Sequence, residues 1–395
     1  MKDLGFKILL FIFIFLPFIP MGATVDSMGA QWVYMVLFNM TSIIFFSLRK
    51  IDLSNLNFKI FVPFMGVIIF SILSLIPAIN KSETFIEIAR LLTLLISMFI
   101  IVIIVKNIGV EYVFYFLFAS LFFELIINNL QYFYENNLLG ISANKNINAI
   151  LLLIKAPILF YLAEKFKNLY LTTFLTLMSF LILFYVIIIE SRTALLSASI
   201  IYLIYFARTI FYEKFKVFKH HGFYLAIFSI ACAILYSENQ QKYESYSESL
   251  NKTINYNETQ SALARLDYYK EAYQGFLDKP ILGHGLGNWK IMSIKYNNSK
   301  LKSYIVPYHV HNDFIQFFVE IGFFGGALYF LYIFLFIYKS FKHSLTNKLK
   351  SIHFFILLSL ICYFFDASLN FPQARPVVQI CFVVLISPFF LKQDR

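Results

Sequence analysis

The amino-acid sequence predicts an all-α polytopic membrane protein, with about twelve transmembrane helices and one large, partly helical loop on the outer face. The 395 residues are 59% hydrophobic and only 14% charged, whereas soluble domains carry roughly 25% charged residues. Apolar runs close to the roughly 17–25 residues that cross a bilayer recur along the whole chain. This composition argues strongly against a soluble protein.

The predicted spans follow one another with a single long interruption. The first, in "GFKILLFIFIFLPFIP", has the basic start and apolar centre of a signal peptide. No small-residue cleavage pattern follows closely, so we expect it to be retained as a span. Hydropathy places the spans near residues 6–20, 31–48, 59–78, 86–105, 111–129, 147–163, 169–189, 193–207, 222–236, 312–338, 353–370 and 376–391.

Basic residues divide unevenly between the two sides of the predicted membrane. Eighteen lie at the termini and in alternate loops, whereas the opposite short loops hold only Lys81, Lys145, Arg192 and Arg375. Cytoplasmic loops are enriched in lysine and arginine, so both termini are expected in the cytoplasm. The net charge of +11 is therefore mostly an orientation signal, and no nucleic-acid partner is expected.

Residues 237–310 form the one long connection, on the outer face between spans nine and ten. It begins polar, continues as the helix-like "ALARLDYYKEAYQGFLDKP" and reaches the turn-rich "ILGHGLGNW". Loops longer than about 15 residues are usually functional or disordered, and the apolar spacing favours an ordered helix here. We therefore expect one transmembrane domain over residues 1–395 with this loop as its main outer element.

Several arginines lie where a charge is costly, at or near the outer end of a span. Arg192 follows a polar break, where Glu190 could pair with it locally, and Arg375 is the only basic residue of its outer turn. Arg265 begins the predicted loop helix, where a solvated charge is the ordinary interpretation. Arg90 lies slightly inside span four, from where its side chain can reach outward.

Lys155 lies deeper, within span six, and needs an internal partner or water. Ion pairing within the bundle is the ordinary interpretation for both Lys155 and Arg90. The cysteines, Cys232, Cys362 and Cys381, fall inside predicted spans without metal-ligand spacing, which indicates packing residues.

His311 stands at the predicted first turn of span ten, followed by Asn312 and Asp313, either of which can cap a helix. A helix N-terminus disfavours an imidazolium, so we expect a neutral ring, which is what a general base requires. An interfacial histidine with a satisfied hydrogen bond is the simpler alternative. His309 can orient the substrate or its neighbour, and no metal is expected because no further ligands accompany the pair.

Eleven residues separate His311 from Gly322, which in a straight helix is about three turns, or ~16 Å. Gly322, Gly325 and Gly326 are therefore expected near the middle of the bilayer. Small residues there permit a kink or close packing of helices.

The stretch "HNDFIQFFVEIGFFG" resembles the signature of bacterial O-antigen ligases. That signature is His, then Asn, Ser or Gln, nine residues, Gly, two residues, and Gly, Thr or Tyr. His311, Asn312, Gly322 and Gly325 occupy these positions. "SRTALLSA", the loop helix leading to "DKPILGHGLGN" and the outer loop before the histidines also agree, so the resemblance covers most of the chain and extends to the O-antigen ligase–polymerase superfamily.

The resemblance implies a glycosyltransferase of the bacterial inner membrane that needs no cofactor or metal. It would move a glycan from undecaprenyl pyrophosphate to lipid A–core oligosaccharide at the periplasmic face. His311 would activate the acceptor hydroxyl, and Arg192 and Arg265 would bind the diphosphate, whose departure guanidinium groups stabilise. The candidate accessory residues are His309, Asn312, Arg375 and Arg90, and Gly322 and Gly325 would be structural.

Three alternatives remain. O-antigen polymerases often carry Arg, ten residues and Gly with two large outer loops, whereas here nine residues separate Arg265 from Gly275. Protein O-oligosaccharyltransferases of the superfamily are usually longer, with an extra C-terminal region. A secondary transporter would use Lys155, Arg90, Glu124 and Asp366 as a charge path within the membrane, but that leaves the outer arginines unexplained.

Overall fold

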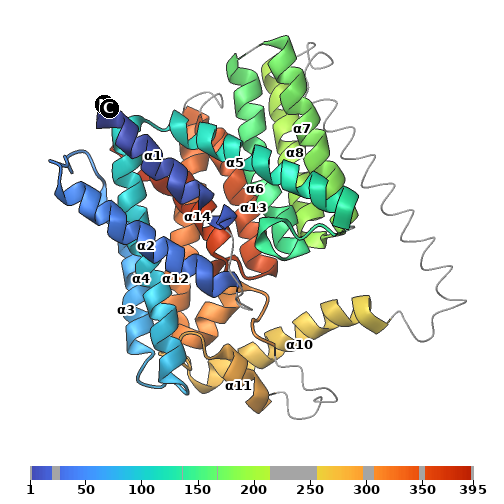
Figure 1. Cartoon of the computed structure of the whole chain (residues 1–395). Coiled ribbons are helices and arrows are strands. Elements are labelled where there is room, and N and C mark those ends of the chain that lie inside the picture. The colour runs from blue at the N-terminus through green and yellow to red at the C-terminus, as the bar shows by residue number, and fades with distance from the viewer. Residues whose placement is uncertain are drawn as a thin grey trace, which may run out of the picture. The chain divides into compact units, whose positions relative to one another are not determined.

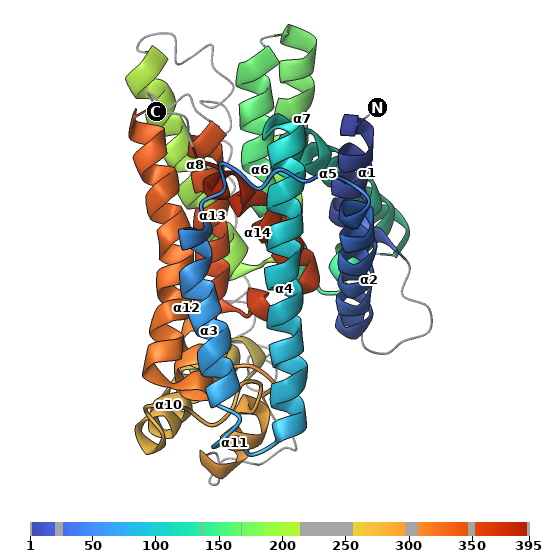
Figure 2. The same ribbon diagram turned by 90° about the vertical axis from the view of Figure 1, so that its left-hand side faces the viewer.

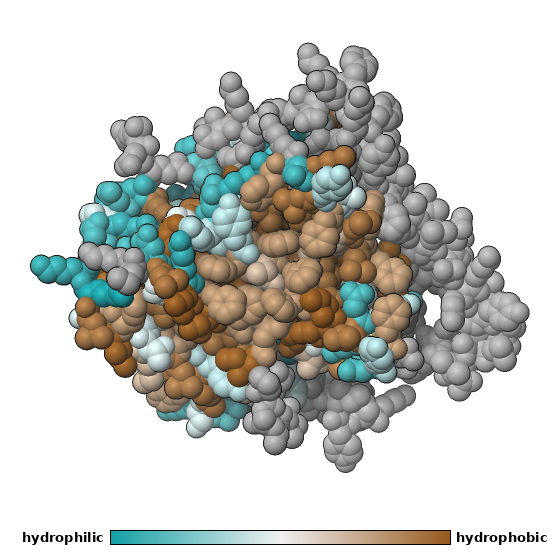
Figure 3. All heavy atoms as spheres, turned by 45° about the horizontal axis from the view of Figure 1, so that its top comes forward, coloured by the Kyte–Doolittle hydropathy of each residue, from teal (hydrophilic) through white to brown (hydrophobic). Residues whose placement is uncertain are grey.

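The computed structural model describes residues 2–19, 27–135, 137–166, 168–213, 256–296, 307–346 and 352–392. In these ranges the chain forms thirteen α-helices and short helical turns, with one isolated β-bridge between Leu56 and Leu391. Eight of the helices in these described ranges are long and apolar enough to cross a membrane. Hydrophobic side chains cover much of the described surface in Figure 3. The protein is a multi-pass membrane protein.

The chain divides into two compact units, each described by itself. The first comprises Met1–Val113, Gln260–Tyr338 and Ala367–Arg395, and the second comprises Phe114–Thr259 and Lys339–Asp366. The short helical turns are η1 (Leu16–Phe18), η2 (Phe58–Phe61), η3 (Gln131–Glu135), η4 (Gly140–Ser142), η6 (Pro372–Ala374) and η7 (Ser387–Phe390).

The first unit is arranged around α4, which contacts α1, α2, α3 and α14 (Figure 2). The side chain of Asn80 caps α4 by accepting hydrogen bonds from the N–H groups of Ser82 and Glu83, and Gly109 follows its last residue. The helices of this unit are α1 (Lys2–Phe15), α2 (Ser27–Ser47), α3 (Val62–Leu73), α4 (Lys81–Ile108), most of α10 (Tyr256–Asp278), α11 (Trp289–Tyr296), most of α12 (Asp313–Thr346) and α14 (Pro376–Ile386).

The second unit has α6 at its centre, in contact with α7 and α8. Lys155 of α6 is buried and pairs with Glu124, and it donates a hydrogen bond to the Ser120 hydroxyl at 2.8 Å. The predicted ion pairing of Lys155 is thereby confirmed. The helices of this unit are most of α5 (Glu111–Leu130), α6 (Lys145–Phe166), α7 (Leu169–Ile189), α8 (Arg192–Glu213) and most of α13 (Ile352–Leu369).

Every predicted span within the described residues lies on a helix, but three of these helices are short. The segments Phe58–Leu73 and Pro376–Phe390 are shorter apolar helices, and α1 has only 14 residues. Proline explains the length of α14, because Pro376 stands at its first turn and Pro388 follows its end. The predicted span at 222–236 lies outside the described residues.

Helix α12 breaks at Gly322, where φ is 76° and ψ is −179°. The Tyr329 hydroxyl lies 3.5 Å from the Asp313 carboxylate, and the rings of Phe317 and Tyr329 stack at 3.9 Å. Asp313 and Tyr329 are sixteen residues apart and would be separated by about 24 Å in a straight helix. Their contact therefore shows that the first part of α12 folds back on the second. The helix is regular from Asp313 to Ile321, so the break changes the direction of the chain after Gly322 and not the rise before it.

The turn between α10 and α11 occupies the break and satisfies its backbone groups. Phe323 donates its N–H to the Pro280 carbonyl at 2.8 Å, and the N–H of Gly285 donates to the Glu320 carbonyl at 2.9 Å. The N–H of His284 donates to the Val319 carbonyl at 3.1 Å. Buried peptide groups need such partners, so the turn between α10 and α11 and the break in α12 require one another.

Candidate functional site

The predicted histidines lie just before α12, fixed by its cap. The side-chain oxygen of Asn312 accepts a hydrogen bond from Ile315 N–H at 3.0 Å, so Asn312 is the cap. Its amide nitrogen donates to the Ser368 carbonyl at 2.8 Å. Asp313 accepts the N–H of Gln373 at 2.9 Å. These bonds join the histidine segment to the end of α13 and to the loop that follows it.

Phe371, in that loop, is the aromatic platform of the site. The His309 ring stacks on it at 4.1 Å and 12°, and the His311 ring meets it edge-on at 5.1 Å. The Arg375 guanidinium lies over the same ring at 4.6 Å. Sequence reasoning missed Phe371, although its place four residues before the lone basic residue of the turn was an available signal.

Helix α10 approaches the histidines from another side. The Tyr269 hydroxyl donates to the His311 carbonyl at 3.2 Å, and the Tyr268 ring lies parallel to the His311 ring at 6.4 Å. The predicted start of this helix at Arg265 is wrong, since α10 begins at Tyr256 and Arg265 lies within it. Polar residues before Arg265 concealed the first turns from an apolar-periodicity criterion.

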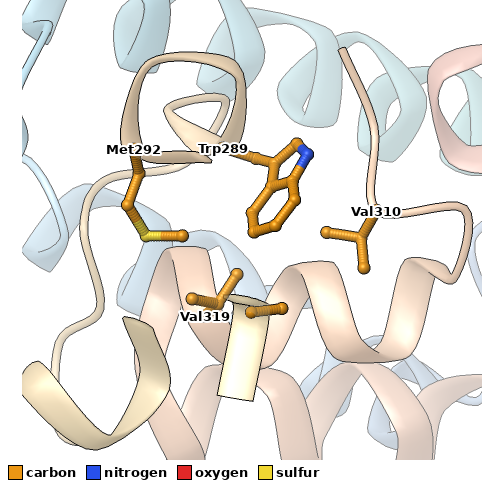
Figure 4. Packing of buried hydrophobic residues seen from close by; sticks show 5 residues of the cluster. Trp289, Met292, Val310 and Val319 are labelled. Carbon is orange, nitrogen blue, oxygen red and sulfur yellow. The ribbon is translucent and has the colours of Figure 1, made fainter. Parts of the chain in front are cut away.

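A small hydrophobic core holds these elements together. It joins α10, α11, the histidine segment and α12, and Tyr269 and Phe276 pack against it. Figure 4 shows the indole of Trp289 between Met292 and Val310, with Val319 beside them. The position of Arg265 relative to His311 therefore depends on ordinary hydrophobic packing. The core residues are Ala272, Trp289, Met292, Val310 and Val319.

Glu320 fastens the turn between α10 and α11 to α12. Its carboxylate accepts the N–H of Gly287 at 2.8 Å and the N–H of Trp289 at 3.1 Å, and Gln316 donates to it at 3.2 Å. The side chain is 2% exposed. The carboxylate therefore accepts hydrogen bonds from N–H groups at the start of α11, which have no partner within that helix.

We expect Glu320→Gln to destabilise the protein by about 1–3 kcal/mol, because one acceptor oxygen becomes a donor that faces a backbone donor. Thermal unfolding of the purified protein in detergent measures this change. Glu83→Gln is the matched control, since Glu83 pairs with Lys290 of α11 at 2.8 Å in a partly exposed position. Such pairs contribute about 0–1 kcal/mol. If the two substitutions lowered the unfolding temperature equally, the role given to Glu320 would be contradicted.

Burial and two arginines keep His311 neutral. The pKa of His311 is lowered from 6.5 to about 4, by burial first and then by the positive charges of Arg265 and Arg375. The pKa of His309 is lowered to about 3, by burial and then by Arg375 and His311. A neutral His311 was predicted from the helix N-terminus, whereas these causes come from parts of the chain remote in sequence.

The backbone and ring of His311 are also unusual. Its φ of 60° lies in the left-handed region, which non-glycine residues occupy at a cost of about 1–2 kcal/mol. Its ring nitrogen Nδ1 is buried and meets no hydrogen-bond partner among the described residues. A strained residue with an unused buried nitrogen is typical of a functional position.

The arginines differ in how they are held. Arg265 makes no hydrogen bond or ion pair with any residue in the described part of the chain. Arg375 donates to the Met28 sulfur at 2.8 Å. Arg90 pairs with Glu87 at 2.5 Å, which confirms its predicted ion pairing. Arg192 is the exposed first residue of α8 in the second unit.

The first unit thus brings together Arg265, His309, His311, Asn312 and Arg375. Two guanidinium groups can bind an anionic group, and a neutral imidazole beside them can accept a proton from a second reacting group. In the described ranges, no three His, Cys, Asp or Glu side chains gather as they would around a metal ion.

Comparison with protein families places part of this arrangement in a known group. Residues 177–330 match the family model Wzy_C, described as O-Antigen ligase. The matched segment contains Arg192, Arg265, His309, His311 and Gly322. A search of curated proteins gave no match.

Proposed function

We propose that the protein is a glycosyltransferase that moves a glycan from undecaprenyl pyrophosphate to lipid A–core oligosaccharide. The reaction takes place at the periplasmic face of the inner membrane, and both termini are cytoplasmic. The observation that carries this proposal is the neutral, partly buried His311 beside the charges of Arg265 and Arg375. The match of residues 177–330 to the O-antigen ligase family supports it.

The arginines bind the diphosphate of the donor. Arg265 is engaged by no hydrogen bond or ion pair within the described residues, so it can bind phosphate oxygens without first breaking one. Bidentate guanidinium contacts stabilise the negative charge that grows on the diphosphate as it leaves. A diphosphate-binding role for Arg192 stays a prediction from the sequence. Burial, together with the positive charge of Arg375, keeps His309 and His311 unprotonated.

His311 is the general base. The acceptor oxygen attacks the anomeric carbon, its proton passes to the imidazole, and the bond from that carbon to the diphosphate oxygen breaks. The donor is already activated by its leaving group, so no nucleotide is required. This single displacement inverts the anomeric configuration, and a product that retained the donor configuration would rule it out.

The acceptor distinguishes this function from its relatives. A polymerase would extend a second lipid-linked glycan, and a protein oligosaccharyltransferase would modify a polypeptide, with the same base and the same arginines. Purified protein in vesicles should therefore be given lipid-linked glycan with each acceptor in turn. Transfer to lipid A–core alone supports a ligase, and transfer to neither lipid nor protein would contradict the proposal.

We expect Arg265→Ala to lower glycan transfer by about 10- to 100-fold, the value of a charge-assisted contact of about 1.5–3 kcal/mol. Lys270→Ala is the matched control on the same helix, because Lys270 is exposed and forms a long ion pair with Asp267 at 3.9 Å. Initial rates at several donor concentrations provide the comparison. If the two variants kept equal rates, Arg265 would not bind the diphosphate.

A further inference from the structure

Helix α10 presents an exposed apolar stripe that its own packing does not explain. Leu266, Tyr273 and Leu277 are 52%, 62% and 57% exposed. Their spacing places them within about 40° of one another around the helix. Tyr269 and Phe276, on the neighbouring face, pack against the core of the site. The stripe is therefore separate from the face that holds α10 in place.

The other border of the stripe is polar. Lys270, Gln274 and Asp278 are exposed and follow one another at intervals of four residues. Asp278 accepts a hydrogen bond from Lys295 at 3.0 Å. Around its circumference α10 thus has a packed face, an apolar exposed stripe and a polar face. Helices that lie in the interface of a bilayer combine an apolar face with a polar one in this way.

The stripe continues into surface that belongs to membrane-crossing helices. Phe323, whose N–H donates to the Pro280 carbonyl at 2.8 Å, is 52% exposed, and Ile281 beside it is 64% exposed. Phe324 stacks with Phe70 of α3 at 5.8 Å. An exposed apolar path therefore leads from α3 and the second part of α12 to the end of α10.

The orientation of α10 agrees with this path. Figures 1 and 2 show α10 at the end of the first unit where α3 and α4 meet, and in Figure 1 its axis runs crosswise to theirs. A helix across the end of a membrane bundle lies parallel to the membrane surface. Tyrosine, such as Tyr273 on the stripe, is enriched at that depth.

We propose that the stripe formed by Leu266, Tyr273, Leu277 and Ile281 lies in the interfacial region of the lipid bilayer. Lipid is the occupant because the stripe is continuous with apolar surface of membrane-crossing helices and is bordered by a polar face. A consequence that rests on the proposed function concerns Arg265, which directly precedes Leu266. The interfacial helix holds this guanidinium at the depth of lipid phosphates, where the diphosphate of a lipid-linked donor arrives.

Spin labels test the proposal. Tyr273→Cys and Leu277→Cys, with Gln274→Cys as the control on the polar face, are labelled after Cys232, Cys362 and Cys381 are changed to alanine. The protein is placed in phosphatidylethanolamine–phosphatidylglycerol vesicles, and the relaxation of each label by oxygen and by a water-soluble nickel chelate is measured. We expect oxygen to relax the labels at positions 273 and 277 more strongly than the nickel chelate does, and the nickel chelate to relax the label at position 274 more strongly than oxygen does.

Two results would overturn the proposal. Nickel dominance at all three positions would place the stripe in water, and low access to both reagents at 273 and 277 would mean that a second copy or another protein covers it. A second measurement keeps all native cysteines. Tyr273→Trp should be quenched more by brominated phospholipid than Gln274→Trp, and equal quenching would also refute the proposal.

The tests separate this inference from the proposed function. Labels in water together with a loss of transfer in Arg265→Ala would leave the function standing and remove the interfacial helix. Labels in lipid together with undiminished transfer in Arg265→Ala would support the interfacial helix and contradict the diphosphate-binding role of Arg265.

Discussion

His311→Ala should reduce glycan transfer by about 10²–10⁴-fold, the usual contribution of a general base. Alanine removes the only group that we assign to accept the proton of the acceptor hydroxyl. The neighbouring contacts to Asn312 and Asp313 stay in place, because they do not involve the imidazole. The measurement is the initial rate of transfer from lipid-linked glycan in vesicles.

His343→Ala is the control for this substitution, since His343 lies in the second unit, near His353. It should leave transfer close to that of the wild type. Thermal unfolding of both variants shows whether a lost rate reflects a lost fold. If His311→Ala transferred glycan as fast as His343→Ala, the general-base role would have to be abandoned.

The pH dependence of transfer reports on the same imidazole. The pKa of His311 is lowered to about 4, so the ring stays neutral, and able to accept a proton, well below the ordinary histidine value. As pH falls through about 4 the ring becomes protonated and the rate falls with it. An acidic limb of kcat/KM centred near pH 4 is expected in the wild type. A limb near 6.5 would mean that neither burial nor the charges of Arg265 and Arg375 lower the pKa of His311 in the working enzyme.

Features governed by local chemistry could be predicted from the sequence. Hydropathy located the helices, because a membrane span is an apolar run whatever its neighbours are. The cap at Asn312 and the pairing of Lys155 likewise follow from what a helix end and a buried charge require. Gly322, Gly325 and Gly326 were identified as positions where this helix could kink or pack closely, and the break is at Gly322.

Features governed by distant contacts could not be predicted. Phe371 gathers His309, His311 and Arg375 around one ring, but it lies sixty residues after His311 and carries no polar group that would mark it. The low pKa of His311 comes from burial and from two arginines on different elements. The reversal of α12 depends on a turn that lies about forty residues earlier in the sequence.

Gly322→Ala should prevent that reversal and cost more than about 4 kcal/mol, a loss that single substitutions rarely reach. A Cβ at this position would lie 2.0 Å from the Ile281 carbonyl oxygen, and the φ of 76° is itself unfavourable for alanine. To relieve the clash, the turn between α10 and α11 must move away from α12. That movement breaks the bonds from Phe323 to Pro280 and from Gly285 to Glu320.

Gly109→Ala separates the clash from the backbone strain. Gly109 also has a positive φ, of 94°, but a Cβ there would meet nothing within 4 Å. It should cost only the backbone strain of about 1–3 kcal/mol. The yield of monodisperse protein and its thermal unfolding in detergent measure both variants. If Gly322→Ala were as stable as Gly109→Ala, the contact with Ile281 would not hold the break, and the turn between α10 and α11 would have to be positioned by the core around Trp289 alone.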